Sequence, residues 1–279
     1  MFGVRSSIST LRRVAVRRPA VTGDFAAAGW RQPDPERLLA QHQGFVDLLD
    51  RLGVQVEVLD PADGQVDACF AYDPVLVTGR GAVELRAAKP DRAAEGAALA
   101  ADLADRGVPT HARLVAPAVA DGGDFCWLGP DLLAGGRGYR TNQAAHDQLA
   151  AVLADEGVRL LTFDLPHDQG PAHVLHLMSC LSPVADDLAV VYEPIAPVAL
   201  LQLLEARGVK WISVDHGEYE TLGTNVLAVA PREVVMFAGN PRTQAALTAQ
   251  GVTVHTVEAT ELAKGDGGPT CLTRPLLRD

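Results

Sequence analysis

Residues 225–257, NVLAVAPREVVMFAGNPRTQAALTAQGVTVHTV, decide the fold. Two apolar runs on either side of Pro231 and Arg232 predict a β-hairpin, since turn residues separate two strand-forming segments. Residues 243–250 are rich in Ala and Leu and predict a helix that ends at Gly251, because glycine commonly caps helices in the left-handed conformation. Residues 252–257 predict a third strand. The unit is therefore strand, strand, helix, strand.

The same unit recurs along the chain. Its hairpins begin at Asp73, Asp124, Leu177 and Asn225, so successive starts differ by 51, 53 and 48 residues. A period of about fifty residues indicates a radial repeat architecture. The second strands are predicted at residues 82–86, 132–135, 188–192 and 234–238. The helices are predicted at residues 93–106, 143–156, 199–207 and 243–250.

A fifth unit forms when the two ends of the chain are joined. Residues 270–277 supply its first strand, residues 13–17 its second, residues 35–51 its helix and residues 54–59 its last strand. Pairing of the termini removes an exposed sheet edge. The sequence therefore predicts one α/β domain over residues 1–279, with pseudo-fivefold symmetry.

Composition narrows the class of protein. The 279 residues are 48% hydrophobic and 21% charged, and 24 basic against 35 acidic residues give a net charge of −11. This surplus of acids argues against a nucleic-acid binder and favours cationic small molecules. No apolar run approaches the roughly 20 residues of a membrane helix. We expect no nucleic-acid or membrane partner.

Two further features bear on location. The first eighteen residues carry five arginines and no acid, which allows a targeting peptide, but the alternation of Val14 and Val16 favours a strand. The four cysteines form no CxxC pair, so neither a disulfide framework nor a thiolate zinc site is expected. A cytoplasmic protein is predicted.

Polar residues interrupt the apolar pattern at equivalent points of the repeats. They are Asp73, Asp121, Asp124, His176, Asn225 and Cys271. In a radial fold these points converge at one end of the central axis. Acid, histidine and thiol would then meet in one pocket, which is the arrangement that nucleophilic catalysis requires.

Cys271 follows the turn-rich loop KGDGGPT, which favours a nucleophile over the alternative, a small buried residue in a terminal strand. Cys69, Cys126 and Cys180 lie in apolar stretches and are predicted to be core residues. His176 suits a general acid and base. The alternatives are a buried core histidine, or a zinc ligand together with His167 and His173.

Carboxylates define the expected ligand. Asp67 and Asp73 are six residues apart on a predicted strand and so point to the same face. Asp121 and Asp124 flank two glycines, and one of them is expected to orient a histidine or a cation. Paired carboxylates suit a planar guanidinium ion, which they bind through bidentate hydrogen bonds. The alternative is a pair of solvated surface acids.

Five separated motifs agree in order and approximate spacing with a known family. They are residues 67–73, DGGD at 121–124, RTNQ at 140–143, HLMS at 176–179 and TCLT at 270–273. Over nearly its whole length the chain resembles the dimethylarginine dimethylaminohydrolase branch of the amidinotransferase, or guanidine-modifying, superfamily. The resemblance implies the five-bladed α/β propeller, or pentein fold, which agrees with the repeat count.

The resemblance also implies roles for individual residues. Cys271 would attack the guanidinium carbon, and His176 would protonate the departing amine and then activate water. Asp121 would orient His176. The remaining implied contacts are with substrate: Asp73 and Asp67 on the guanidinium nitrogens, and Arg92 and Arg140 on the α-carboxylate. No metal or organic cofactor is implied, and a homodimer is allowed.

One position departs from the family pattern. Tyr72 precedes Asp73 where dimethylarginine-specific relatives carry a second carboxylate. A stacked or cation–π contact with the substrate guanidinium could compensate for the lost acid. The expected reaction is hydrolysis of a methylated arginine or a related guanidino compound to citrulline and an alkylamine.

Other functions stay open from the sequence. Within the same chemistry, the chain could be an arginine deiminase-like hydrolase or an amidinotransferase that passes the amidino group to an amine. From a different class, it could be a non-catalytic protein that binds a cationic amino acid. A generic cysteine–histidine amidase is disfavoured, because paired acids oppose a developing negative charge.

Overall fold

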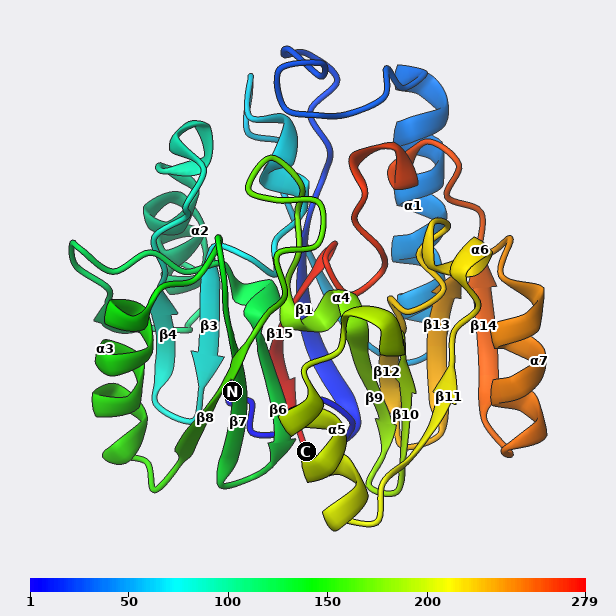
Figure 1. Cartoon of the computed structure of the whole chain (residues 1–279). Helices are drawn as coiled ribbons and strands as arrows, with labels where there is room; N and C mark the ends of the chain where they lie inside the picture. Colours follow the sequence, from blue (N-terminus) through cyan, green and yellow to red (C-terminus); the bar gives the residue numbers. More distant parts are fainter.

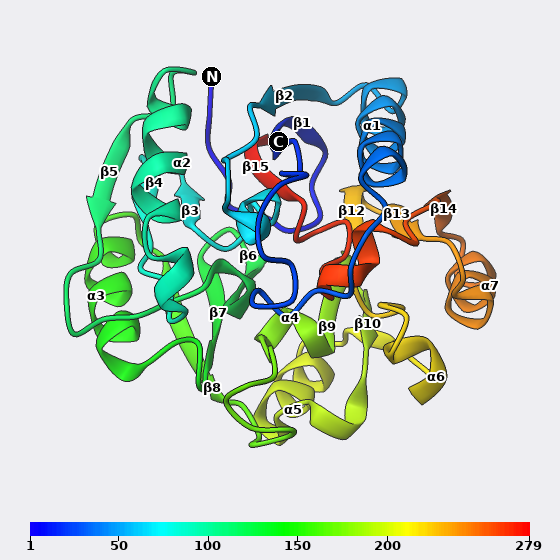
Figure 2. The same cartoon turned by 90° about the horizontal axis from the view of Figure 1, so that it is seen from above.

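Five three-stranded sheets surround a central axis in the computed structural model, which describes residues 1–279. Figure 1 shows the sheets from the side and Figure 2 looks along the axis. In each sheet the inner strand pairs antiparallel with the middle strand, which pairs parallel with the outer strand. The predicted five-bladed α/β propeller is confirmed.

The strands follow the predicted order. From the inner to the outer strand, the sheets are β3 (Val75–Thr78), β4 (Gly81–Glu84) and β5 (Thr110–Arg113); β6 (Phe125–Gly129), β7 (Leu132–Arg137) and β8 (Arg159–Asp164); β9 (Leu181–Ala185), β10 (Leu188–Val191) and β11 (Lys210–Ser213); β12 (Leu227–Ala230), β13 (Glu233–Phe237) and β14 (Thr253–Val257); and β15 (Thr273–Arg278), β1 (Leu11–Arg17) and β2 (Gln55–Leu59).

A helix connects the middle strand to the outer strand of every sheet and lies on the outside of the ring (Figure 2). These helices are α1 (Pro35–Arg51), α2 (Glu95–Ala104), α3 (Gln143–Ala154), α5 (Val198–Ala206) and α7 (Pro241–Ala249). Asp34 and Asn142 cap α1 and α3 by accepting hydrogen bonds from the first turn. None of the helices is both long and apolar enough to span a membrane.

Glycine follows each of these five helices, as the sequence predicts for all but α1. The residues after the helices include Gly53, Gly107, Gly157, Gly208 and Gly251, whose φ angles lie between 70° and 80°. This is the left-handed region, which costs glycine little and other residues more. Helix lengths are thus set by local sequence.

The fifth sheet joins the two ends of the chain. Strand β1 pairs antiparallel with β15, with Val16 opposite Thr273, and parallel with β2, with Arg17 opposite Leu59. The prediction that residues 270–277 and 13–17 share a sheet is therefore confirmed. Closure brings the C-terminal segment, including Cys271, back to the axis.

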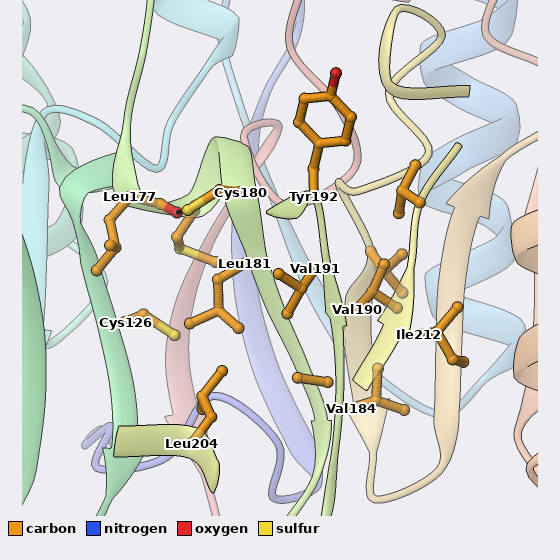
Figure 3. Close-up of a cluster of buried hydrophobic side chains, with 14 of the residues drawn as sticks. Cys126, Leu177, Cys180, Leu181, Val184, Val190, Val191, Tyr192, Leu204 and Ile212 are labelled. Atoms are coloured by element: carbon orange, nitrogen blue, oxygen red, sulfur yellow. Dashed lines mark hydrogen bonds between the residues drawn. The ribbon is translucent and has the colours of Figure 1, made fainter. Parts of the chain in front are cut away.

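Buried apolar side chains fill the space between the sheets and their helices. The strands β3, β4 and β10 are buried at every residue, because the helices cover one face and neighbouring sheets the other. Figure 3 shows Cys126 and Cys180 among Leu181, Val190 and Leu204 in one such cluster. Cys69, Cys126 and Cys180 are all buried, as predicted.

Short helical turns in the connections between the main strands and helices were not predicted. They comprise α4 (Leu177–Cys180), α6 (His216–Tyr219) and 3₁₀ turns at Val66–Cys69, Pro90–Arg92, Gly122–Asp124, Glu193–Ile195 and Leu262–Gly265. One prediction was wrong in its local structure: Asp67 lies in a 3₁₀ turn and not on a strand with Asp73. Four or fewer residues in a turn have no helical periodicity that sequence could reveal.

Closure by β15 leads to a stability prediction. Leu276 is fully buried, whereas its neighbour Leu277 is only half-buried. We expect Leu276→Ala to lower the free energy of unfolding by about 2–5 kcal/mol, because it leaves a cavity in the core. Urea unfolding would measure this loss. Leu277→Ala is the matched control, and an equal loss in both variants would contradict the inner position of Leu276.

Candidate active site

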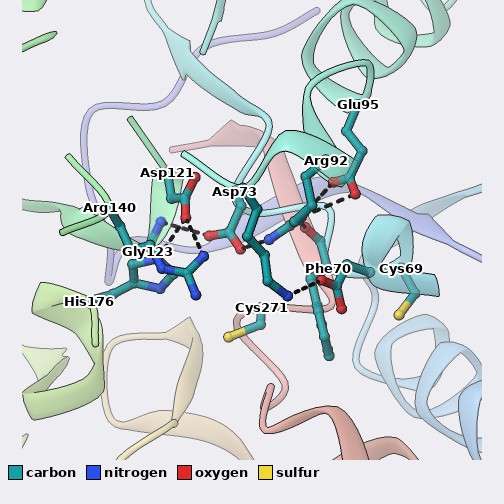
Figure 4. A network of polar contacts seen from close by, with 12 residues as sticks. Cys69, Phe70, Asp73, Arg92, Glu95, Asp121, Gly123, Arg140, His176 and Cys271 are labelled. Atoms are coloured by element: carbon teal, nitrogen blue, oxygen red, sulfur yellow. Dashed lines mark hydrogen bonds and ion pairs between the residues drawn. The ribbon is translucent and has the colours of Figure 1, made fainter. Parts of the chain in front are cut away.

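One cavity of about 530 Å³ collects the predicted site residues. Seven of the eight line it: Asp67, Tyr72, Asp73, Arg92, Arg140, His176 and Cys271. The eighth, Asp121, is almost completely buried behind His176. Most of these residues come from segments that lead into inner strands, whereas Arg92 and Arg140 follow the middle strands β4 and β7. Figure 4 shows Asp73, His176 and Cys271 side by side, so these residues from separate segments meet in one pocket.

Asp73 lies at the centre of the polar network. Its Oδ1 atom accepts a hydrogen bond of 2.9 Å from the backbone N–H of Gly123. Its Oδ2 atom lies 2.8 Å from Nη1 of Arg92. Glu95 binds the same guanidinium group, at 2.7 Å from Nη2. Asp73 is therefore held rigidly between a backbone donor and a buried cation (Figure 4).

Arg92 is in the cavity but its charge is already balanced. Burial disfavours its cation, yet Asp73 and Glu95 raise the pKa of Arg92 well above its usual value. Arg140 lies on the other side of the site, with Nη1 3.5 Å from Oδ2 of Asp121. Both arginines thus pair with acids of the site itself. Sequence reasoning missed Glu95, although its spacing of three residues from Arg92 suits a helical ion pair.

His176 is hydrogen-bonded to Asp121. Its Nε2 atom is 3.2 Å from Oδ2 of Asp121, so the predicted pair is present. Burial by itself lowers the pKa of His176, but Asp73, Asp121 and Asp124 outweigh this effect and raise the pKa to about 9. The imidazole is therefore protonated at neutral pH. Burial by itself raises the pKa of Asp121. The hydrogen bond from His176 and the positive charge of His176 outweigh this effect, so the pKa of Asp121 is lowered overall.

Two side chains, the buried Asp124 and the partly buried Ser179, hold the loop that carries His176. Asp124 accepts hydrogen bonds from the backbone N–H of Leu177 at 2.9 Å and from the hydroxyl of Thr141 at 2.6 Å. Burial raises the pKa of Asp124 to about 7. Ser179 accepts a 3.0 Å hydrogen bond from the backbone N–H of His176. Of the two acids in DGGD, Asp121 thus contacts the imidazole of His176 and Asp124 holds the backbone of the next residue, Leu177.

Cys271 receives a hydrogen bond from a neighbouring repeat. The side-chain amide of Asn225 donates to its Sγ atom at 3.1 Å, and Oδ1 of Asn225 accepts from the backbone N–H of Thr270. Burial and the charge of Asp73 raise the pKa of Cys271 to about 11, so the group is a thiol at neutral pH. Asn225 lay among the polar interruptions of the sequence, but its contact with Cys271 could not be read there.

Asp67 is bound by two side chains that sequence reasoning did not identify. Trp30 donates its indole N–H to Oδ1 at 2.8 Å, and Nζ of Lys89 lies 2.9 Å from Oδ2. Both partners are more than twenty residues away in sequence and have no local motif. Asp67 therefore lies at the side of the cavity with its charge compensated, and does not form a pair with Asp73.

The ring of Tyr72 stacks on the guanidinium group of Arg274. The guanidinium carbon of Arg274 lies 3.9 Å from its ring centroid, and its hydroxyl donates to the carbonyl of Phe125 at 3.3 Å. The sequence suggested that a substrate cation could stack on this ring; in the structure the cation that stacks on it is the buried Arg274.

No group of three or more histidine, cysteine, aspartate or glutamate side chains is placed to hold a metal ion. His167 is hydrogen-bonded to the Tyr139 hydroxyl at 2.6 Å. The alternative of a zinc site at His167, His173 and His176 is therefore not supported by the geometry. The chemistry of the site rests on thiol, imidazole and carboxylates.

Gly123, the second glycine of DGGD, packs so closely against the ring of His176 that a larger residue does not fit. A Cβ atom on Gly123 would lie 2.5 Å from Nδ1 of His176. We expect Gly123→Ala to push the ring away from Asp121 and so to lower the pKa of His176 below about 9, which NMR titration of the imidazole would measure. Gly44→Ala, in α1 with no atom within 4 Å of its Cβ, is the control and should leave this pKa unchanged. An unaltered pKa in Gly123→Ala would contradict the packing argument.

Comparisons with known proteins agree with this geometry. The sequence pattern of the arginine deiminase family matches residues 196–278. The arginine deiminase of Rhodococcus erythropolis is 30% identical over 191 residues, and the match covers 58% of this chain and about half (47%) of that protein.

Matches that cover more of the chain come from the dimethylarginine dimethylaminohydrolases. The dimethylarginine dimethylaminohydrolase of Pseudomonas aeruginosa is 27% identical over 264 residues, covering 94% of this chain and 98% of that protein. A solved structure of the Pseudomonas aeruginosa enzyme, a cysteine-to-serine variant complexed with citrulline, superposes with a TM-score of 0.80 at 25% identity and covers 97% of this chain and 100% of that one. Over nearly its whole length the chain is therefore similar in sequence and in fold to dimethylarginine dimethylaminohydrolases, and its C-terminal part matches the arginine deiminase family.

Proposed function

We propose that this protein hydrolyses the guanidino group of a methylated arginine or a related guanidino compound, giving citrulline and an alkylamine. One observation carries the proposal: Cys271, the His176–Asp121 pair and Asp73 open onto a single cavity. The similarity to a dimethylarginine dimethylaminohydrolase with bound citrulline supports the same substrate class. Because the cavity draws on segments from residue 67 to residue 271, we propose that residues 1–279 act as one catalytic domain.

A cationic substrate activates the thiol. With a pKa of about 11, Cys271 is a poor nucleophile in the free protein. A guanidinium ion beside Sγ stabilises the thiolate, because an opposite charge within a few ångströms lowers a thiol's pKa. The N–H of Asn225 stabilises the same thiolate. Activation therefore depends on the substrate's own charge, so that a neutral ligand leaves the thiol protonated.

The first half of the reaction forms a covalent intermediate. Cys271 releases its thiol proton to solvent, and the resulting thiolate bonds to the guanidinium carbon and gives a neutral tetrahedral species. His176, protonated at neutral pH, transfers its proton to the departing nitrogen. The C–N bond breaks, the amine leaves, and an S-alkylthiouronium cation remains on Cys271. Nearby carboxylates, chiefly Asp73, stabilise this cation.

Water completes the reaction. His176, now neutral, takes a proton from water, and the oxygen bonds to the thiouronium carbon. The C–S bond then breaks, Cys271 leaves as thiolate and takes the hydroxyl proton to restore the thiol, and the product carries a neutral urea group in place of the guanidino group. Asp121 stabilises the histidine cation in both halves through its 3.2 Å contact. We propose that Arg92 and Arg140 bind the substrate α-carboxylate when substrate displaces part of their pairing with the acids.

The nucleophile is tested by Cys271→Ser. We expect turnover to fall by about 10³-fold or more, because serine lacks an accessible anion at neutral pH, while binding of the guanidino compound is retained. A screen of guanidino compounds with mass detection should find the adduct on wild type alone. Cys180→Ala is the control, since Cys180 is a buried core residue. Unchanged turnover in Cys271→Ser would overturn the mechanism, and release of ammonia or an amidino adduct would indicate a deiminase or a transferase.

The general acid is tested by pH dependence. The folded pKa of His176 is about 9, so we expect kcat/KM to fall as pH rises through about 9, where the imidazole loses its proton. Asp121→Asn removes one carboxylate that holds the cation and should move this limb to lower pH by about one unit. Asp164→Asn, an exposed acid, is the control. A limb that stays in place in Asp121→Asn excludes His176 as the titrating group.

A further inference from the structure

One charged side chain in the wall of the candidate site cavity has no partner. Every lysine, arginine and aspartate of this wall lies within 3.5 Å of an opposite charge, in the pairs Arg31–Asp266, Lys89–Asp67, Arg92–Asp73 and Arg140–Asp121. Glu220 is exposed and lines the same cavity, but its carboxylate forms neither an ion pair nor a hydrogen bond within the chain. The wall therefore offers one accessible negative charge to a ligand.

Glu220 follows α6, a turn that neighbouring residues hold in place. The buried carboxylate of Glu218 accepts hydrogen bonds from the backbone N–H of Thr243 in α7 at 2.8 Å and from its hydroxyl at 2.6 Å. The ring of Tyr219 stacks on that of Tyr192, and the two ring centroids are 3.9 Å apart. The backbone at Glu220 is thus fixed, while its side chain has no other contact to make.

A short turn connects Glu220 to the residue that binds the candidate nucleophile. The backbone N–H of Leu222 donates to the carbonyl of Tyr219, and the N–H of Asn225 donates to the carbonyl of Leu222, each at 3.0 Å. Asn225 in turn donates to Sγ of Cys271. In Figure 1, α6 lies at the same end of the sheets as α4. Glu220 and Cys271 therefore line one cavity and are joined by hydrogen-bonded backbone.

Glu220 acts on groups away from the reacting end of the cavity. Burial and the charge of Asp73 raise the pKa of Cys271, whereas burial and the charge of Glu220 raise the pKa of Tyr192. Glu220 also adds to the effect of burial on the pKa of Tyr219. Electrostatic influence weakens with distance. Asp73 therefore faces the guanidinium end of a bound substrate, and Glu220 faces its remote end.

We propose that Glu220, together with the hydroxyl of Tyr219, binds the α-ammonium group of a guanidino amino acid and so selects amino acids among guanidino compounds. This assignment rests on the proposed function, in which Arg92 and Arg140 bind the α-carboxylate at the same end of the substrate. An ammonium group has three N–H donors, for which a carboxylate and a phenol oxygen supply acceptors. The hydroxyl of Tyr219 lines the cavity side and forms no hydrogen bond within the chain.

A guanidino acid without the ammonium group is disfavoured for two reasons. It lacks the charge-assisted hydrogen bond to Glu220, and it still removes water from this carboxylate when it fills the cavity. A carboxylate that has neither water nor a cation beside it is unfavourable. The free charge of Glu220 therefore favours α-amino acids over deaminated guanidino acids of the same chain length.

Binding to the Cys271→Ser protein tests this subsite without turnover. Methylarginine and its deamino analogue, in which hydrogen replaces the α-ammonium group, share the guanidinium group, the chain and the carboxylate. By isothermal titration calorimetry, we expect methylarginine to bind about 10-fold or more tightly than the analogue. Equal affinity for the two compounds, or no binding of methylarginine, would overturn the proposal.

Glu220→Gln, made in the Cys271→Ser protein, keeps the size of the side chain and removes its charge. We expect it to weaken binding of methylarginine about 10-fold and not to weaken binding of the deamino analogue. Glu205→Gln, which removes an exposed acid of α5, is the control and should change neither affinity. Equal weakening of both ligands by Glu220→Gln would contradict a contact with the ammonium group. A preference for methylarginine without turnover in the wild-type protein would refute the proposed hydrolysis alone.

Discussion

Pairing of the two chain ends in one sheet is the interaction on which the rest of the structure depends. Strand β15 supplies the inner strand of the fifth sheet, and β1 and β2 supply the others. Without this pairing, β15 would have no partner and the ring would have two open edges. The same pairing places Cys271, just before β15, next to Asn225 and the segment of Tyr72. The strand pairing that closes the ring of sheets therefore also places Cys271 in the candidate site.

Charge compensation is the second constraint. Asp67, Asp73, Glu95 and Asp121 are all buried at the site, and each lies within 3.5 Å of a cation. Uncompensated, these acids would carry a large desolvation cost. Three of the aspartates of this end also keep His176 protonated at neutral pH. The arrangement that stabilises the buried acids thus supplies the proton donor that the proposed chemistry needs.

Two neighbouring cavities share residues that adjoin the site groups. Asp73 and Cys271 contribute to the larger cavity, whereas their neighbours Tyr72 and Thr270 line both it and a small second cavity of about 20 Å³ between the inner strands. Tyr72 also provides the ring on which the guanidinium group of Arg274 stacks, so this position links the segment that carries Asp73 to the buried cation of β15.

The sequence by itself determined the repeat, the helix boundaries and the convergence of the site residues, because these follow from apolar periodicity, capping glycines and turn residues within each fifty-residue unit. The motifs that resemble those of a known family also predicted Cys271, His176 and Asp121 as catalytic residues. Only the tertiary structure decided which partners these residues take. Trp30 and Lys89 on Asp67, Asn225 on Cys271 and Arg274 on Tyr72 join residues from different segments. Such contacts depend on how the five sheets pack around the central axis. Local sequence patterns do not specify that packing, so the contacts could not be predicted from them.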